Sequence, residues 1–151
     1  MIVVSDTTAV TTLIKARREH LLQNLFGNVM VPRAVWDELR AFHLQLPDFV
    51  SLRPVTAMVE IQSLGRGEAE AIQLAREVQA DLLLSDDLKA RAVATRLKIK
   101  CAGLLGVMVR AKQTGYIASV REVIEALEAQ GGLYLSETVK AEALKLAGES
   151  Q

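Results

Sequence analysis

The sequence predicts an α/β fold of three layers, with a mainly parallel central sheet between helices and a helical C-terminal part. Short apolar runs typical of buried strands alternate with segments in which apolar residues recur every three or four positions, as on one helix face. Strands and helices that alternate in this way are joined by right-handed crossovers, so that neighbouring strands are parallel. Residues 104–147 carry only the helical pattern.

The strands are predicted from apolar runs bounded by polar residues. The first run, Ile2-Val-Val4, is typical of a strand that is buried on both faces. Pro54 removes a backbone donor, so the run that contains it fits an edge strand. Cys101 is the single cysteine, and its place in the last run indicates a small core residue. The predicted strands are residues 2–4, 29–31, 50–55, 82–84 and 99–102.

The helices are predicted from apolar spacing and from capping residues. Pro32 suits a first helical turn, Ser119 and Glu122 form a capping box, and Ser136 suits an N-cap. The predicted helices are one after Thr8, one at 21–26, then 33–42, 68–77, 88–97 and 104–114, and one after each of Ser119 and Ser136. Their expected apolar faces include Val35, Leu39 and Phe42 in the third helix and Val139, Ala143 and Leu146 in the last.

Composition excludes several classes of protein. A chain of 151 residues is expected to form one domain, residues 1–151. Lys and Arg total 18 and so do Asp and Glu, which argues against sequence-blind coating of nucleic acid. No apolar run approaches the roughly 20 residues of a membrane helix, and Met1 leads directly into a strand, so a cytoplasmic location without membrane contact is expected. One cysteine and two histidines cannot build a thiol or imidazole metal cage.

Acidic residues lie at the ends of two predicted strands. Asp6 follows the first strand, and Asp86 and Asp87 follow the strand at 82–84. Parallel strands place these positions at the same edge of the sheet, where open α/β sheets bind their ligands. Each acid also has a structural interpretation, because Asp is a favoured helix N-cap.

Two helix-borne glutamates are placed to reach the same edge. Glu38 borders the buried face of its helix, and Glu68 is expected on the core side of its own, whereas Glu70 is expected to point away. Pairing of Glu38 with a nearby arginine and a favourable dipole contact of Glu68 are the structural alternatives. Carboxylates held close together repel one another, and a hard cation bound between them usually offsets this repulsion. Oxygen-only ligands suit Mg²⁺ or Mn²⁺.

These acidic motifs, in this order and spacing, resemble those of the PIN-domain family, and within it the small VapC-like proteins grouped as a domain of unknown function. The likeness covers about the first 110 residues. It is carried by Ile2-Val-Val-Ser-Asp-Thr-Thr8, Val31-Pro-Arg-Ala-Val-Trp-Asp-Glu-Leu39, Gly67-Glu-Ala-Glu-Ala-Ile72 and Leu82-Leu-Leu-Ser-Asp-Asp-Leu-Lys-Ala-Arg91. In the last motif either Asp86 or Asp87 takes the acidic place, and Glu68 stands where many relatives have Asp.

The resemblance implies a Mg²⁺- or Mn²⁺-dependent ribonuclease that leaves 5′-phosphate and 3′-hydroxyl ends. It also implies the toxin half of a toxin–antitoxin pair, with an antitoxin protein as partner, and often a homodimer. The implied catalytic and metal-binding residues are Asp6, Glu38, Glu68 and Asp86 or Asp87. One or two cations there would make a water molecule more acidic and stabilise the transition state.

Further residues beside these motifs are candidates for supporting roles. The hydroxyls of Thr8 and Ser85 are placed to orient an acid or a bound water. Arg66, Lys89 and Arg91 flank the motifs and are candidates for phosphate contacts, with solvated surface charges as the alternative. Aromatic residues make up only 4% of the chain, which argues against extensive base stacking.

Two other classes of function compete with a nuclease. The first is a binding module with weak or no cleavage, which uses the helical C-terminal part to hold a second copy or an antitoxin peptide. The second is phosphotransfer or phosphatase chemistry on an α/β scaffold. A haloacid-dehalogenase-like phosphatase has a second Asp two residues after the first, where this chain has Thr8.

Overall fold

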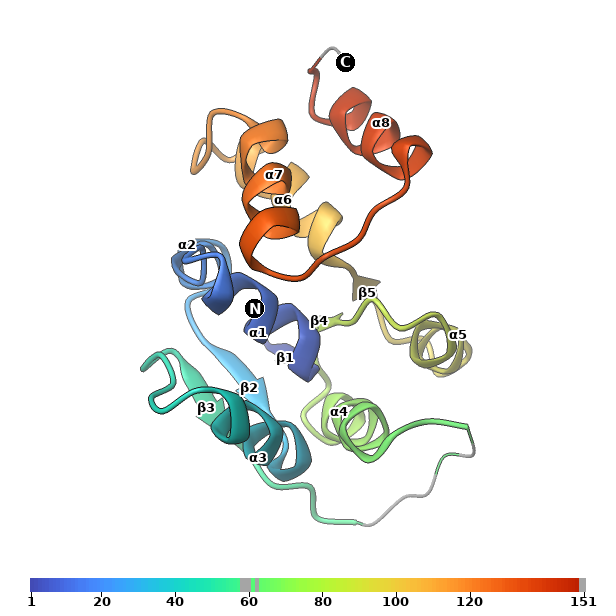
Figure 1. Cartoon of the computed structure of the whole chain (residues 1–151). Coiled ribbons are helices and arrows are strands. Elements are labelled where there is room, and N and C mark those ends of the chain that lie inside the picture. The colour runs from blue at the N-terminus through green and yellow to red at the C-terminus, as the bar shows by residue number, and fades with distance from the viewer. Residues whose placement is uncertain (58–60, 62, 150–151) are drawn as a thin grey trace.

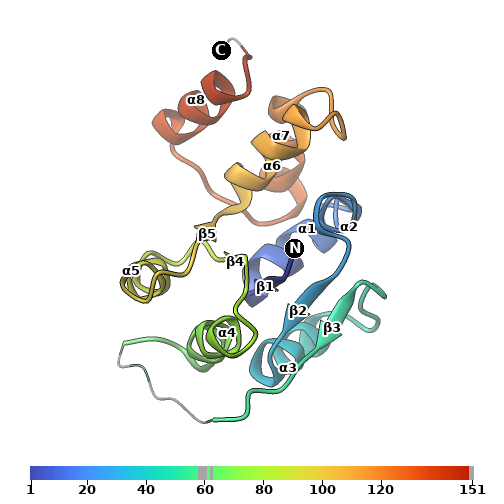
Figure 2. The same ribbon diagram turned by 180° about the vertical axis from the view of Figure 1, so that it is seen from behind.

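A five-stranded parallel sheet lies between layers of helices in the computed structural model of the protein (Figures 1 and 2). The structure describes residues 1–57, 61 and 63–149. The strand order is β3-β2-β1-β4-β5, and all four neighbouring pairs are parallel. The strands are β1 (Val3–Ser5), β2 (Val29–Val31), β3 (Val50–Leu52), β4 (Leu82–Leu84) and β5 (Cys101–Ala102).

The helices follow the order that the sequence pattern predicts. In the described residues they are α1 (Thr7–Lys15), α2 (His20–Phe26), α3 (Arg33–Phe42), α4 (Arg66–Glu77), α5 (Leu88–Arg96), α6 (Leu104–Gln113), α7 (Val120–Gln130) and α8 (Glu137–Leu146). The helical C-terminal part is therefore confirmed as three helices, α6 to α8. The hydroxyls of Ser119 and Ser136 accept hydrogen bonds from the N–H groups of Glu122 and Val139, so both predicted N-caps form.

The two faces of the sheet are buried against different helices. Val3 and Leu84 pack in a core with α1, α2, α3, α6 and α7, whereas Val4 and Leu83 pack against α4 and α5. Alternate residues of one strand point to opposite faces, so an uninterrupted apolar strand serves both layers. This arrangement confirms the predicted three-layer α/β/α fold.

Several local predictions differ from the structure. The apolar spacing predicts Phe42 on the buried face of its helix, but this residue is 69% exposed, because α3 ends there and the ring lies beside Lys15 at the surface. Val139 and Leu146 of α8 are also exposed, since only one side of this terminal helix meets a neighbour. Cys101 is half-buried because β5 is the edge strand, whereas the sequence pattern predicts a core position.

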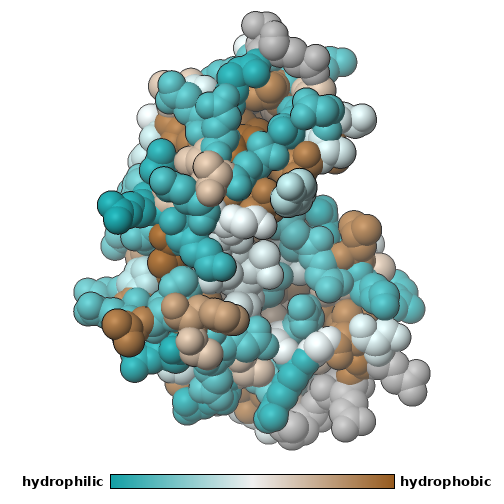
Figure 3. Space-filling model, in the orientation of Figure 1, coloured by the Kyte–Doolittle hydropathy of each residue, from teal (hydrophilic) through white to brown (hydrophobic). Residues whose placement is uncertain are grey.

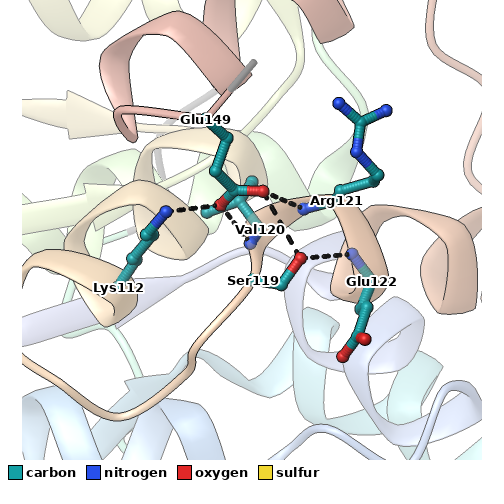
Figure 4. Close-up of polar contacts among 6 residues, drawn as sticks. All are labelled: Lys112, Ser119, Val120, Arg121, Glu122 and Glu149. Atoms are coloured by element: carbon teal, nitrogen blue, oxygen red, sulfur yellow. Dashed lines mark hydrogen bonds and ion pairs between the residues drawn. The ribbon is translucent and has the colours of Figure 1, made fainter. Parts of the chain in front are cut away.

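The C-terminal end of α8 is held by one carboxylate (Figure 4). Glu149 accepts hydrogen bonds from the backbone N–H groups of Val120 (2.6 Å) and Arg121 (3.2 Å) and from the Ser119 hydroxyl, and pairs with the Lys112 ammonium at 3.0 Å. Burial opposes ionisation of this carboxyl, but the N–H of Val120, the Lys112 ammonium and the N–H of Arg121 outweigh it and lower its pKa to about 2. Glu149 thus fastens the chain after α8 to the first turn of α7.

We expect the E149Q variant to lose this fastening at neutral pH. A folded-state pKa below the ordinary value stabilises the protein above about pH 4.5, and this contribution disappears as the pH falls towards 2. Loss of a charge-assisted contact of this kind costs about 1–2 kcal/mol, or a melting temperature lower by about 3–6 °C. Thermal melts of both proteins from neutral to acidic pH test this, with E142Q on exposed α8 surface as control. Parallel curves for wild type and E149Q would contradict the assignment.

Among the helices of the described chain, none combines the length and the apolar character needed to cross a bilayer.

Candidate functional site

The carboxyl ends of β1 and β4 bring their acids to one edge of the sheet. Asp6 follows β1 and caps α1, where its carboxylate accepts the N–H of Ala9 at 3.1 Å. The side chain is only 5% exposed. Burial raises the pKa of Asp6 to about 6. The hydrogen bonds from Ala9 and Ser85 lower this pKa, and the negative charges of Asp86 and Glu68 raise it further. Asp6 therefore caps α1 and also lies at the carboxyl edge of the sheet.

The two acids after β4 point in different directions. Asp86 is exposed and acts electrostatically on Asp6, and its carboxylate accepts the N–H of Leu104 at 3.1 Å, at the start of α6. Asp87 instead caps α5 and accepts the N–H of Ala90 at 3.0 Å. Gly103 lies against the Asp86 carboxylate, where a Cβ atom would overlap it. The absent side chain at this position lets the start of α6 approach Asp86.

Glu38 and Glu68 come from α3 and α4 and lie close to the turn that carries Asp6. The Thr7 hydroxyl, next to Asp6 in the chain, donates to Glu38 at 2.6 Å. A Cβ atom on Gly67 would lie 3.0 Å from the same carboxylate, so Glu38 also meets the first turn of α4. The Glu68 carboxylate turns back over that helix end and is near enough to raise the pKa of Asp6. Four separate elements thus bring carboxylates towards one edge.

The hydroxyl groups near the acids differ in their contacts. Ser85 is buried, hydrogen bonds with Asp6 and accepts the N–H of Asp87 at 3.3 Å. Thr8 is exposed, while its neighbour Thr7 holds Glu38. The helix that begins after Asp6 turns these two adjacent hydroxyls to different sides.

The expectation that Glu70 points away from the core is wrong. Its side chain is buried, and one carboxylate oxygen accepts the N–H of Ala34 at 3.0 Å, in the first turn of α3. The other accepts Nε of Arg66 at 3.0 Å. Glu70 therefore joins α3 to α4 and fixes the base of the Arg66 guanidinium. The four-residue spacing from Arg66 to Glu70 is a sequence signal for this pair.

Basic side chains flank the acids on both sides. Arg66 belongs to the α3–α4 side, and its side chain is 73% exposed although Glu70 holds its Nε. Arg91 lies on the β5–α6 side, with a guanidinium nitrogen 3.5 Å from where a Cβ atom on Gly103 would be. Lys89 is exposed on α5.

The acids fit a hard divalent cation by donor type and charge. Burial and the charges of two further carboxylates make Asp6 harder to ionise. A bound cation would stabilise its ionised form. In the described part of the chain, no three His, Cys, Asp or Glu side chains stand ready to hold a metal ion together. Asp86 and Glu38 are instead turned to Leu104 and Thr7.

A parallel α/β sheet with acids gathered at its carboxyl edge fits the α/β class of nuclease folds. The chain belongs to the PIN-domain family, since the family described as DUF3368, PIN domain, matches residues 2–149. PIN domains are generally nucleases and generally use divalent metals.

Among solved structures, the chain is similar to a PilT N-terminus domain protein, SSO1118, from the archaeon Sulfolobus solfataricus P2. The two are 18% identical, with a TM-score of 0.53, and the match covers 71% of this chain and 90% of that one. At this identity the likeness supports the fold alone. No curated protein matches the chain.

Proposed function

We propose that this protein is a Mg²⁺- or Mn²⁺-dependent ribonuclease that hydrolyses RNA phosphodiester bonds. The observation that carries the proposal is the buried Asp6 carboxylate, which lies at the carboxyl edge of the sheet within electrostatic reach of Asp86 and Glu68. Membership of the PIN-domain family supports a nuclease. A carboxylate kept out of water beside two like charges destabilises the folded protein unless it has a partner.

The residues at the acidic edge would have separate roles in binding the cation and in holding Asp6. Asp6, Glu68 and Asp86 would hold the cation, with Glu38 close by on the Thr7 hydroxyl. When bound, the cation would lower the pKa of water and stabilise negative charge on the phosphate. Ser85 and the N–H of Ala9 would keep the Asp6 carboxylate in place.

The cationic side chains on either side of the acids would position the RNA. Arg66 and Arg91 would contact phosphates next to the scissile one, from opposite sides of Asp6. Because Glu70 fixes Nε of Arg66, the terminal nitrogens of that guanidinium are presented to solvent in a restricted range of directions. Cleavage would leave 5′-phosphate and 3′-hydroxyl ends.

The biological setting that we propose is that of a toxin with a protein antitoxin, in the cytoplasm and as a homodimer. An apolar groove of about 840 Å³ between α6 and α8 supports a protein partner. Its lining includes the exposed side chains of Val139 and Leu146. Figure 3 shows the surface hollowed between the C-terminal helices and α5. The same groove favours a second candidate function, a binding module with weak or no cleavage.

The test is incubation of purified protein with RNA in Mg²⁺, Mn²⁺ or EDTA, with the D6N variant as control. We expect cleavage that requires the cation and Asp6, with 5′-phosphate ends on the products. Mn²⁺ binding without any cleavage would favour the binding module. Cleavage that survives both EDTA and D6N would exclude this site.

Mn²⁺ binding should release a proton at mildly acidic pH. In the metal-free fold Asp6 keeps its proton up to about pH 6, which is above its ordinary pKa of 3.8, so a cation has to displace that proton at lower pH. We expect Mn²⁺ affinity to rise up to about tenfold per pH unit below pH 6 and to level off above about pH 7. The same raised pKa makes metal-free stability fall as the pH rises from about 4 through 6.

Calorimetric titration in buffers of different ionisation enthalpy measures this proton release. About one proton per Mn²⁺ is expected near pH 5 and almost none near pH 8. The D6N variant should release none at either pH. Equal release at both values would show that Asp6 is not a metal ligand.

A further inference from the structure

A cationic groove lies on the outer side of the sheet, between α5 and the edge strand β5. Its volume is about 530 Å³, and it is lined by Arg91, Thr95, Lys98, Ile99, Lys100 and Cys101. Three of these six residues are cations and none is an acid. The whole chain carries equal numbers of basic and acidic residues, so this surface concentrates positive charge that the average composition conceals. Figures 1 and 2 show α5 beside β5 at this side of the sheet.

The inner end of this groove adjoins the acidic edge. Arg91 lines the groove and also approaches Gly103, which lies against the Asp86 carboxylate. Burial is the main cause that raises the pKa of the Cys101 thiol. The charge of Arg91 lowers this pKa and the charge of Asp6 raises it. Cys101 is therefore close to both the groove and the acids. A ligand in the groove would therefore end at Arg91, next to the acidic edge at Asp86.

The chemistry of the groove suits a chain of phosphates. Arg91 comes from the first half of α5, and Lys98 and Lys100 come from the segment between α5 and β5, so two separate parts of the lining carry cations. Arg91 and Arg110 also line the groove between α6 and α8, but the rest of that lining is mainly apolar and includes Glu142. Lysines and arginines in a groove that tracks the backbone are typical of proteins that bind single-stranded nucleic acid. This lining has no aromatic side chain, so binding there would depend on phosphate contacts.

We propose that the groove formed by Arg91, Lys98 and Lys100 binds the backbone of single-stranded RNA beyond the scissile phosphate. The inference rests on the proposed ribonuclease function and adds the surface along which the RNA backbone leaves the acidic edge. The RNA strand crosses the acidic edge at Asp6 and Asp86 and leaves past Arg91 over β5. Lys98 and Lys100 then contact phosphates outside the reacting group.

The single cysteine offers a direct test of occupancy. Cys101 is half-buried in the groove wall, so bound RNA should shield its thiol from a maleimide or a disulfide reagent. The full-length protein is treated at mildly alkaline pH, with EDTA present to keep the RNA intact, and the rate of modification is followed by mass spectrometry. We expect a short single-stranded RNA to slow modification about tenfold at saturation, and a duplex of the same sequence to protect much less.

Substitutions in the groove provide the second measurement. The K98Q/K100Q variant should bind single-stranded RNA about tenfold more weakly, and the slope of log affinity against log salt should become shallower by about 1.4, or 0.7 for each lost phosphate contact. The matched control is R40Q/K145Q, which removes two exposed cations from α3 and α8. This control should leave both the affinity and Cys101 protection close to wild type. A thermal melt verifies that each variant folds.

The outcomes separate the groove from the nuclease. RNA cleavage by wild type with no protection of Cys101, or with equal salt slopes for the two double variants, would overturn the groove and leave the proposed function intact. Equal protection by duplex and single strand would overturn the strandedness. Neither cleavage nor binding of RNA by a folded wild-type protein would overturn both. Protection that is lost only in K98Q/K100Q supports the proposal.

Discussion

The D6N variant should lose RNA cleavage by at least about a hundredfold and should no longer bind Mn²⁺. Asp6 is the buried acid at the centre of the cluster, and Asp86 and Glu68 both act on it. Replacing even a residue that only supports a metal ligand costs 10–100-fold in affinity or activity by the usual scale, so loss of the ligand itself should cost about that or more. Initial rates of cleavage of a labelled RNA, together with Mn²⁺ calorimetry, measure both effects.

The same substitution should not weaken the fold. The side-chain oxygen of the asparagine in D6N would still accept the N–H of Ala9, because Asn caps helices as well as Asp does. The substitution would also remove a buried carboxyl whose pKa is raised from 3.8 to about 6, and whose ionisation costs about 3 kcal/mol at neutral pH. The melting temperature of metal-free D6N should therefore equal or exceed that of wild type. An unfolded or strongly destabilised D6N would mean that Asp6 is mainly structural.

The sheet could be predicted well because strands that are buried on both faces have an unmistakable pattern. Neither face of β1 or β4 can be exposed to solvent, because consecutive residues are apolar: Val3 and Val4 in one strand, Leu83 and Leu84 in the other. Each strand ends where polar residues begin. Parallel order then follows from the helices between strands. The terminal helix is harder to predict, because α8 has an apolar stripe of which only Ala143 and Leu144 become buried. Periodicity shows that a helix has an apolar face but not whether a neighbour covers it.

The candidate site could be predicted only as far as the sheet determines it. The positions of Asp6 and Asp86 could be predicted because each follows the end of a strand. The helical pattern misplaces Glu70, because it does not reveal that the first turn of α3 packs against this side chain. That contact joins residues 36 positions apart in the chain. The same limit applies to hydroxyls, since Thr7 and Thr8 are equivalent in sequence and only the docking of α3 brings Glu38 to Thr7. Long-range packing decides such details, and one sequence contains no local signal of it.

The choice between Asp86 and Asp87 depends on the turn after β4, and a pair of isosteric variants should resolve it. D86N should reduce cleavage about a hundredfold, since Asp86 is the acid that acts on Asp6, while D87N should stay within about threefold of wild type. Asp87 is turned into α5, where its carboxylate accepts the N–H of Ala90 at 3.0 Å. Asn serves this capping role nearly as well, so D87N should also keep its melting temperature.

The two variants are matched controls for each other. Each removes one negative charge from the same turn, so a general change in RNA attraction would affect both equally. Cleavage rates and Mn²⁺ affinities at one salt concentration therefore isolate the role of each carboxylate. If D87N were the inactive variant, the turn would have to rearrange when the cation binds, releasing Asp87 from the end of α5 and placing it where the metal-free protein has Asp86. Equal activity in both would remove the acids after β4 from the site and leave Asp6, Glu38 and Glu68 as its carboxylates.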